Sequence, residues 1–578
     1  MTHHNIQKQD KQSPRLRILS GFVFIFAFLL IYKLLDLQVF SGAQLRASAL
    51  SQHSTVRFLP AERGEIFYGD VFSEDLYSLA TNRVFKHVYI IPRDIKNIET
   101  AFNVLWPLVE ERGITEDTLR YRLSKRNDIY EPLISKLSET ELEPFKALNL
   151  EGLGWEDETW RYYPEKETLA HALGFVGIKD SLRVGQYGLE GYWQEDLQGV
   201  QGILEGDTDI TGTLIQTGYK KIEEPEKGTD FILTIDRTIQ AFACQKLAER
   251  VEKIKAAKGT VIIVDPKTGA IIAMCSVPTF DPNKYNEVED ISVYLNPAIS
   301  EAYESGSVFK PITMAAAIDS GSITPETTYI DEGKVKIGKY TIHNSDRKAH
   351  GEVDMITVLN ESLNTGTIFI QRETGKDIFR DYVHKFGFGR ITDIELGNEL
   401  AGDISSLDKK GDIFAATASY GQGITVTPMQ LVMAYAAIAN EGKLMKPYII
   451  KETRKNNKVN ITEPSMVQES ISLRASTIVS AMMVSVIEDG HAKSAGVDGY
   501  FIAGKTGTAQ VAEDGKYGNS TIHSFAGFGP VDNPEFAMLV KLDYPQVEVY
   551  AASTAAPLFG EIAKFMLQYL EVLPDNKI

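Results

Sequence analysis

The N-terminal part of the chain changes abruptly from polar to apolar. Residues 2–17 are mostly polar, whereas residues 18–32 contain no charged side chain and the apolar run continues to Leu35. A span of about 20 apolar residues is long enough to cross a membrane as a helix. The pattern predicts a cytoplasmic tail at 1–17 and a transmembrane anchor at 18–38.

The cations ahead of this segment predict its orientation. They are Lys8, Lys11, Arg15 and Arg17. Positive charge keeps the N-terminal end in the cytoplasm, so the rest of the chain is expected outside. A cleaved signal peptide is the alternative, because Ser41-Gly42-Ala43 is an acceptable small-residue cleavage site. The length of the apolar run favours the uncleaved anchor.

Residues 39–228 alternate short strand-like runs with charged helical segments. They contain no cluster of side chains suited to catalysis, so we expect a non-catalytic spacer or docking domain. Arg63, Arg161 and Glu190 each stand beside glycine or tyrosine. We interpret them as buried structural ion pairs.

Residues 229–578 show longer and more regular elements. The apolar runs predict strands at 231–235, 260–264, 270–276, 500–511, 524–528 and 535–542, helices at 238–255 and 555–570, and a helical block from 307 to about 439. Residues 265–269, with proline early and glycine late, are typical of a hairpin turn. The simplest assembly is an α+β domain. The last five strands form one antiparallel sheet, the two helices pack on it, and the helical block is inserted mid-chain.

Composition narrows the class of protein. The chain has 578 residues, of which 24% are charged and 43% hydrophobic, as in globular proteins. A formal net charge of −18 argues against a nucleic-acid partner. No Cys/His cluster has metal-ligand spacing, so we expect no metal site and no cofactor. The two cysteines, Cys244 and Cys275, are interpreted as buried small residues rather than as a disulfide.

A candidate nucleophile opens the helical block. Ser307 stands three residues before Lys310, ahead of an apolar run. Gly306 permits a tight turn and Pro311 is tolerated in a first helical turn. Positions i and i+3 share a helix face, so the hydroxyl and the amine can meet and activate serine without histidine. The same spacing recurs in polar, turn-like sequence at Ser345/Lys348 and Ser406/Lys409.

Two more motifs complete a candidate site. Ser362-Leu363-Asn364 is the only Ser-x-Asn in the chain, and Lys505-Thr506-Gly507-Thr508 lies on a later predicted strand. Lys310 can accept the Ser307 proton if burial and the charge of Lys505 lower its pKa. Ser362 can relay that proton to a leaving amine, and Asn364 can hold Lys310 and a substrate amide.

The predicted strand at 500–511 supplies the remaining functions. Its backbone can pair with an extended peptide by strand addition, and Gly507 allows close approach. Lys505, Thr506 and Thr508 can bind a terminal carboxylate. The backbone N–H groups of Ser307 and Thr508 would form an oxyanion hole.

These motifs, in this order, resemble those of penicillin-binding proteins, and specifically of class B, from about residue 18 to the end. Further matching segments are Arg63-Gly64-Glu65-Ile66, Arg161-Tyr162-Tyr163-Pro164, Gly188-Leu189-Glu190, Leu233-Thr234-Ile235-Asp236, Gly421–Pro428 and Ala503–Gln510. The run Gly423-Ile424-Thr425-Val426-Thr427-Pro428 is more similar to the cell-division branch than to the elongation branch. Ser305, where the family commonly has proline, is a local departure.

The resemblance implies a peptidoglycan D,D-transpeptidase in the bacterial cell membrane, with its catalytic domain outside. It also implies that residues 39–228 form a non-catalytic, dimerisation-like pedestal domain and residues 229–578 the transpeptidase domain. It implies acylation of Ser307 by a stem peptide ending in D-Ala-D-Ala, release of D-Ala and transfer to a neighbouring stem. It also implies acylation by β-lactams and, as partner, a SEDS-type membrane glycosyltransferase with other cell-wall or division proteins. The alternatives are a β-lactam sensor, a β-lactamase, or a structural activator of the glycosyltransferase.

Overall fold

The computed structural model describes residues 14–42, 54–180, 182–207, 220–513, 516–548 and 550–575. The chain divides into two compact units. The first comprises residues 1–62 and 199–227, and the second comprises residues 63–198 and 228–578.

The first unit contains the predicted anchor. Helix α1 (Pro14–Leu35) continues into a π-helical turn, η1 (Asp36–Phe40). The segment Arg15–Phe40 is, by length and composition, long and apolar enough to cross a membrane. Ala43 of the alternative cleavage site lies outside the described residues. The unit also holds an antiparallel sheet of β1 (Ser54–Leu59), β8 (Gly202–Asp207) and β9 (Lys220–Glu223).

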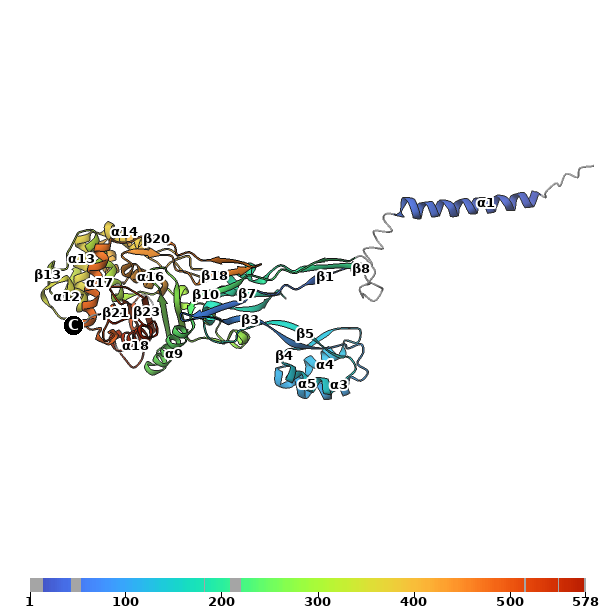
Figure 1. The fold of residues 1–578 in the computed structure, drawn as a ribbon, viewed down its shortest axis with the longest axis horizontal. Helices are drawn as coiled ribbons and strands as arrows, with labels where there is room; N and C mark the ends of the chain where they lie inside the picture. The colour runs from blue at the N-terminus through green and yellow to red at the C-terminus, as the bar shows by residue number, and fades with distance from the viewer. Residues whose placement is uncertain are drawn as a thin grey trace, which may run out of the picture. The chain divides into compact units, whose positions relative to one another are not determined.

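A seven-stranded sheet runs through the second unit, in the order β19-β18-β10-β2-β3-β4 with β5 also on β3 (Figure 1). Its strands are β2 (Ile66–Asp70), β3 (Ser73–Ile90), β4 (Glu131–Leu137), β5 (Leu153–Tyr162), β10 (Asp230–Asp236), β18 (Ile450–Lys455) and β19 (Lys458–Ile461). Strand β10 pairs in parallel with β2 and antiparallel with β18. The predicted strand at 231–235 therefore joins the pedestal sheet, and hydrogen bonds link the pedestal to the C-terminal half.

A small helical lobe has its own core beside β3 and β4 (Figure 1). Its elements are α3 (Ile98–Val109), η2 (Glu110–Arg112), α4 (Glu116–Ser124) and α5 (Glu139–Ala147). Asn97, Thr115 and Ser138 cap the three α-helices through their side-chain oxygens. The remaining pedestal elements are α6 (Ala170–Leu173), β6 (Phe175–Lys179), β7 (Leu182–Gln186), α7 (Gly188–Tyr192) and α8 (Gln194–Gln198).

A buried triad of charges ties distant parts of the pedestal together. The fully buried Glu190 lies 2.5 Å from Arg63 Nη2 and 2.6 Å from Arg161 Nε. Burial opposes ionisation of Glu190, but the two guanidinium groups outweigh it and hold its pKa below the usual value. Tyr163 also donates to Glu190, at 3.2 Å. The structure places these ion pairs where the sequence interpretation expected buried ones.

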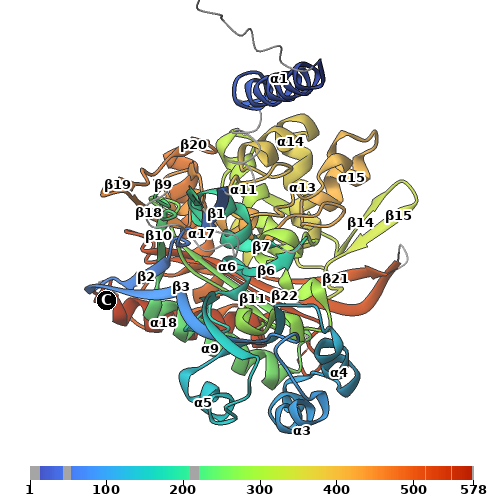
Figure 2. The same cartoon turned by 90° about the vertical axis from the view of Figure 1, so that its right-hand side faces the viewer.

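The C-terminal half is built on an antiparallel five-stranded sheet, in the order β12-β11-β23-β22-β21. Its strands are β11 (Lys258–Val264), β12 (Ile271–Val277), β21 (Ala503–Glu513), β22 (Lys516–Gly529) and β23 (Phe536–Asp543). Helices α9 (Arg237–Ile254) and α18 (Ala555–Tyr569) cover one face (Figure 2), and α16 (Pro428–Ala439) of the helical block contacts the other (Figure 1). This is the predicted α+β architecture.

The inserted block is less purely helical than predicted. Its helices are η5 (Gly306–Phe309), α11 (Lys310–Asp319), α12 (Met355–Asn360), α13 (Asn364–Thr374), α14 (Lys376–Lys385), η6 (Ser405–Asp408), α15 (Asp412–Ala418) and α16 (Pro428–Ala439). Two small strand pairs interrupt them, β13 (Thr328–Asp331) with β16 (Gly351–Asp354) and β14 (Lys334–Ile337) with β15 (Tyr340–His343). These strands are short, so their local pattern carried little signal.

Shorter elements connect the block to the sheet and to α18. Before the block stand η3 (Pro282–Glu287), η4 (Ile291–Tyr294) and α10 (Pro297–Ser300). After it come β17 (Lys443–Met445), β20 (Met466–Glu469), α17 (Leu473–Glu488), η7 (Lys493–Ala495) and η8 (Ala551–Ser553).

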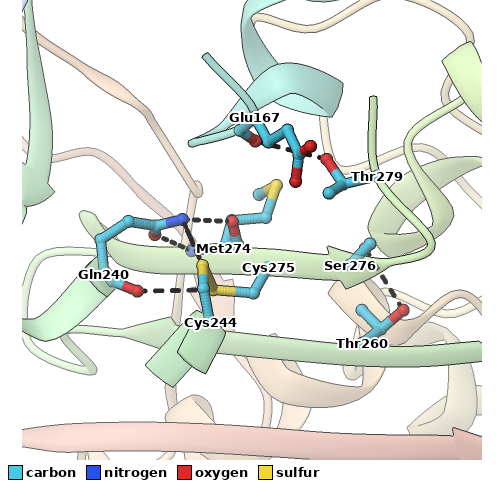
Figure 3. Close-up of a disulfide and its surroundings, with 8 residues drawn as sticks. All are labelled: Glu167, Gln240, Cys244, Thr260, Met274, Cys275, Ser276 and Thr279. Carbon is cyan, nitrogen blue, oxygen red and sulfur yellow. Dashed lines mark hydrogen bonds between the residues drawn. A yellow bond between two sulfur atoms is a disulfide. The ribbon is translucent and has the colours of Figure 1, made fainter. Parts of the chain in front are cut away.

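The two cysteines form a disulfide, so the prediction of two separate buried thiols was wrong. Cys244 on α9 is bonded to Cys275 on β12, with Cα atoms 5.3 Å apart (Figure 3). Beside it, Gln240 donates to the Met274 carbonyl at 2.9 Å and accepts from the Met274 N–H at 2.8 Å. The cysteines meet only because α9 packs on β12, which their spacing in sequence does not reveal.

Candidate active site

Ser307 lies in a short 3-10 turn, η5, that leads directly into α11. Gly306 begins the turn with a φ of +61°, a left-handed conformation that glycine adopts at little cost. Pro311 occupies the first turn of α11, as predicted. Ser307 is half-buried, and its hydroxyl makes no hydrogen bond within the described ranges. It therefore has no competing partner there.

A neighbouring turn braces this one through very close backbone contacts. The Gly306 N–H donates to the Gly421 carbonyl at 3.0 Å, and Glu304 Oε1 accepts from the Gly423 N–H at 2.9 Å. A Cβ atom on Gly421 would lie 2.3 Å from the Gly306 carbonyl oxygen. Only glycine permits that approach, which accounts for its position in the Gly421–Pro428 run.

Lys310 brings two of the three sequence motifs together. Its Nζ donates to the Ser362 carbonyl at 2.5 Å, to Ser362 Oγ at 3.3 Å and to Asn364 Oδ1 at 2.9 Å. The Lys310 side chain is 0% exposed. No hydrogen bond joins Lys310 to Ser307 among the residues described, so the expected meeting of these two groups stays a prediction.

The backbone conformation at Ser362 explains how Ser362 and Asn364 can both contact the amine of Lys310. Ser362 stands between α12 and α13 with a φ of +56°, which turns the chain sharply. Asn364 then begins α13, and its Nδ2 donates to the carbonyl of His343 on β15 at 3.0 Å. That bond leaves the amide oxygen of Asn364 for Lys310.

Strand β21 carries the third motif at the edge of the sheet. Among the described strands its one neighbour is β22, so its other edge is available to an extended peptide. A Cβ atom on Gly507 would lie 2.9 Å from the Ser305 carbonyl oxygen and 3.1 Å from the Val308 nitrogen. The glycine thus allows β21 to pack against η5, a role that the sequence did not suggest.

The side chains around Gly507 have different surroundings. Lys505 is 1% exposed, and its Nζ donates to the Thr506 carbonyl at 3.2 Å. Thr508 Oγ1 accepts from the Ala551 N–H at 3.1 Å. Packing of β21 on η5 brings the Ser307 turn beside this strand. The assignment of the Ser307 and Thr508 N–H groups to an oxyanion hole stays a prediction.

The two buried lysines have lowered pKa values. Burial is the larger cause at Lys310, and the charge of Lys505 adds to it, so the pKa of Lys310 lies well below 10.5. Burial lowers the pKa of Lys505 to about 7. Neither forms an ion pair with a carboxylate in the described part of the chain. A neutral amine near neutral pH is a group that can take a proton from serine.

The hydrogen bonds of Lys310 also orient such an amine. A neutral –NH2 group has two N–H donors and one lone pair. The Ser362 carbonyl and Asn364 Oδ1 can only accept, so they take both donors. The lone pair is then left for a hydroxyl, either that of Ser362 or that of Ser307.

Sequence motifs did not reveal the residues behind Asn364. The carbonyl of His343 accepts from Asn364, and the carboxylate of Asp331 and the side chain of Asn344 form a network with the next residue, Thr365. They come from the short strands of the inserted block, whose pattern predicts no regular element. The proximity of Thr365 to the Ser-x-Asn motif was the one available signal.

Comparison with known domains matches both halves of the chain. Residues 259–564, more than half of it, match the family described as penicillin binding protein transpeptidase domain. Residues 58–233 match the family described as penicillin-binding protein dimerisation domain.

Whole proteins match over nearly the full length. The chain is 32% identical over 540 residues to stage V sporulation protein D of Bacillus subtilis, covering 92% of this chain and 82% of that protein. It is 29% identical over 584 residues to the peptidoglycan D,D-transpeptidase FtsI of Buchnera aphidicola, covering 98% and 97%. Penicillin binding protein 3 from Mycobacterium tuberculosis, complexed with aztreonam, has the same fold, with a TM-score of 0.68 at 24% identity and coverages of 90% and 98%.

Proposed function

Because this chain belongs to the class B penicillin-binding proteins, we propose that it is a serine-type peptidoglycan D,D-transpeptidase. The observation that carries the proposal is the environment of Lys310. A buried amine with a lowered pKa is held by Ser362 and Asn364, one helical turn from Ser307. This arrangement places a base, Lys310, close in sequence to the serine nucleophile, Ser307. The three motifs also follow one another in the order that is typical of the family.

In the first half-reaction, Ser307 Oγ attacks the carbonyl carbon of the penultimate D-alanine. Lys310 takes the hydroxyl proton as the C–O bond forms, and N–H groups of Ser307 and Thr508 stabilise the developing oxyanion. The peptide C–N bond then breaks. The proton passes from Lys310, directly or through Ser362, to the leaving amine, and D-alanine departs from an ester on Ser307.

In the second half-reaction, an amine of a neighbouring stem peptide attacks the ester carbonyl. An amide bond forms and the bond to Ser307 Oγ breaks. The proton released by the amine returns to Oγ through the same lysine, so the free enzyme is regenerated. This sequence closes the proton balance without a metal or a cofactor.

The edge of β21 would hold the donor peptide. An extended backbone adds to the open edge of the strand, and its terminal carboxylate meets Lys505, Thr506 and Thr508. A β-lactam presents a strained amide and a carboxylate in a similar arrangement. The aztreonam complex of the related fold supports β-lactam binding here.

The N-terminal helix anchors the protein in the bacterial cell membrane. We place the N-terminus in the cytoplasm, because Arg15 and Arg17 precede the apolar span, and the catalytic domain outside. Names of relatives such as FtsI favour the cell-division branch of the family. A SEDS-type glycosyltransferase as partner stays a prediction from the resemblance.

Labelled penicillin tests this proposal directly. The purified protein is expected to form a stable covalent adduct at Ser307, located by peptide mass spectrometry. Ser307→Ala is expected to fold and to remain unlabelled. Ser345→Ala, which removes the serine of another Ser-x-x-Lys, is the matched control and should label like the wild type. Labelling of folded Ser307→Ala contradicts the assignment, and rapid hydrolysis of penicillin identifies a β-lactamase instead.

A further inference from the structure

A buried carboxylate behind the active site gathers four hydrogen bonds. Asp331 is 1% exposed. Its oxygens accept from the N–H groups of Gly333 at 3.0 Å and His350 at 3.1 Å, from Asn344 Nδ2 at 2.9 Å and from Thr365 Oγ1 at 2.7 Å. No ion pair involves Asp331 in the ranges that the structure describes. The side chains of Asp331, Asn344 and Thr365 are called the Asp331 clasp below.

Two members of the Asp331 clasp are chain neighbours of residues at the active site. Thr365 follows Asn364, and Asn344 follows His343, the hydrogen-bond partner of Asn364. Asn344 Oδ1 accepts from the Thr365 N–H at 3.1 Å and lies 2.9 Å from Thr365 Oγ1. Their chain neighbours are joined as well, because Asn364 Nδ2 donates to the His343 carbonyl at 3.0 Å. Two consecutive residues of β15 and its exit are thus fastened to two consecutive residues of α13.

We propose that the Asp331 clasp is a positioning device for acylation, which keeps the amide oxygen of Asn364, rather than its nitrogen, toward Lys310. The inference rests on the proposed function, since it concerns the base of that reaction. Asp331, Asn344 and Thr365 act through Asn364 and do not touch the reacting atoms.

The direction of the Asn364 amide follows from its two partners. With Nδ2 on the His343 carbonyl, Oδ1 accepts from Lys310. If the His343 carbonyl moved, the amide could turn and place its N–H donors against the amine. The amine would then lose one of the two acceptors that aim its lone pair at a hydroxyl. Small displacements of this kind lower rates strongly, because reacting groups must be aligned.

The composition of the Asp331 clasp also favours positioning over simple stability. A buried carboxylate with no cation is costly to desolvate, and an apolar contact of similar size would hold two segments at lower cost. Hydrogen bonds, unlike apolar contacts, fix direction as well as distance. The amide of Asn364 requires contacts that fix its direction, because its oxygen and not its nitrogen must face Lys310.

The test compares isosteric variants by their rate of acylation with a fluorescent penicillin. Thr365→Val keeps the shape and removes the hydroxyl, and Asp331→Asn keeps the size and removes the charge. Each is expected to lower the second-order rate constant about tenfold or more. Thr365→Ser, which keeps the hydroxyl, should have a second-order rate constant close to that of the wild type. Asp346→Asn, which alters an exposed carboxylate bonded to His350 and Lys348, is the matched control.

The pH profile separates positioning from general loosening. Lys505 is the titratable group whose charge acts on Lys310. Losing the Asn364 oxygen disfavours the protonated amine, so the acidic limb should move to lower pH. Entry of water would stabilise the ammonium and move that limb to higher pH.

Three outcomes would overturn the proposal. The first is a folded Thr365→Val or Asp331→Asn with a wild-type rate and profile. The second is an acidic limb that moves to higher pH, which assigns the Asp331 clasp to packing. The third is loss of folding in both variants, which assigns it to stability. Labelling of Ser307→Ala tests the proposed function separately. That function would therefore stand even if the positioning role of the Asp331 clasp were disproved.

Discussion

Lys310, at the start of α11, and Lys505, on β21, differ from the buried Lys541 on β23 in what surrounds them. Lys541 is also buried, but it lies 2.5 Å from Asp543 and 3.5 Å from Glu301. Lys310 and Lys505 have no such carboxylate among the described residues, and burial lowers the pKa of both. Burial without a neighbouring carboxylate favours the neutral form of an amine. The difference separates a structural lysine from two that can take part in chemistry.

In the proposed mechanism Lys310 acts as a neutral amine and Lys505 as a cation, which predicts a bell-shaped pH profile for acylation. The rate constant should rise with pH as Lys310 becomes neutral. It should fall as pH passes about 7, where Lys505 loses the charge that we propose for carboxylate binding. Because the two charges interact, the limbs belong to the pair. Rates with fluorescent penicillin, measured wherever the chain stays folded, give the profile.

Lys505→Arg identifies the alkaline limb. Arginine keeps its proton throughout the accessible range, so the fall at high pH should disappear while the acidic limb remains. An unchanged alkaline limb in the folded variant would rule out Lys505 as its source.

At the scale of elements, the site depends on how closely β21 lies against η5. The contact is made mostly by backbone, with Gly507 facing the Ser305 carbonyl and the Val308 nitrogen, together with Cγ1 of Val308. Backbone atoms cannot move aside as a flexible side chain can. The separation of the nucleophile turn from the substrate strand is therefore set by the absence of one Cβ atom.

Gly507→Ala should reduce acylation while the domain stays folded. The added methyl forces β21 from η5, at a cost of about 1 to 3 kcal/mol in stability, and a shift of this kind can lower the rate about 100-fold. The acylation rate and the melting temperature are the measurements. Gly397→Ala, where a Cβ would meet nothing within 4 Å, is the control. A wild-type acylation rate in Gly507→Ala would show that the close contact is not required.

Elements were predictable where the signal is local. The strand predicted at 260–264 is β11 (Lys258–Val264), and the helix predicted at 555–570 is α18 (Ala555–Tyr569). The partner of β10 was not predictable, because pairing with β2 and β18 depends on long-range contacts. The same limit hid Asn344, which reaches Thr365 only after the inserted strands fold back on α13.

At the scale of the molecule, Glu190 is the point on which much of the pedestal depends. Its two oxygens bind Arg63, which precedes β2, and Arg161, at the end of β5. Arg161 also donates to the Gly64 carbonyl at 2.7 Å. Since β2 pairs with β10, this triad lies one strand away from the elements that lead into the catalytic half.

Glu190→Gln should destabilise the protein by about 3 kcal/mol or more, because it leaves two buried guanidinium groups without their counter-charge. Urea unfolding at neutral pH is the measurement. Glu195→Gln, an exposed carboxylate on α8, should change stability little. In the wild type the Glu190 contribution is present above its unfolded pKa and is lost as pH falls through its lowered folded value. Equal stability of the two variants would contradict this role.

The disulfide between α9 and β12 bears on the stage at which the protein reaches its full stability. It closes a loop with a sequence separation of 31, which in a chain-entropy description contributes about 3 to 4 kcal/mol. In the proposed topology the catalytic half lies outside the membrane, whereas thiols stay reduced in a bacterial cytoplasm. That topology implies that the disulfide forms only after translocation. Protein produced in a reducing cytoplasm should then be reoxidised before its stability is compared with that of the disulfide-bonded form.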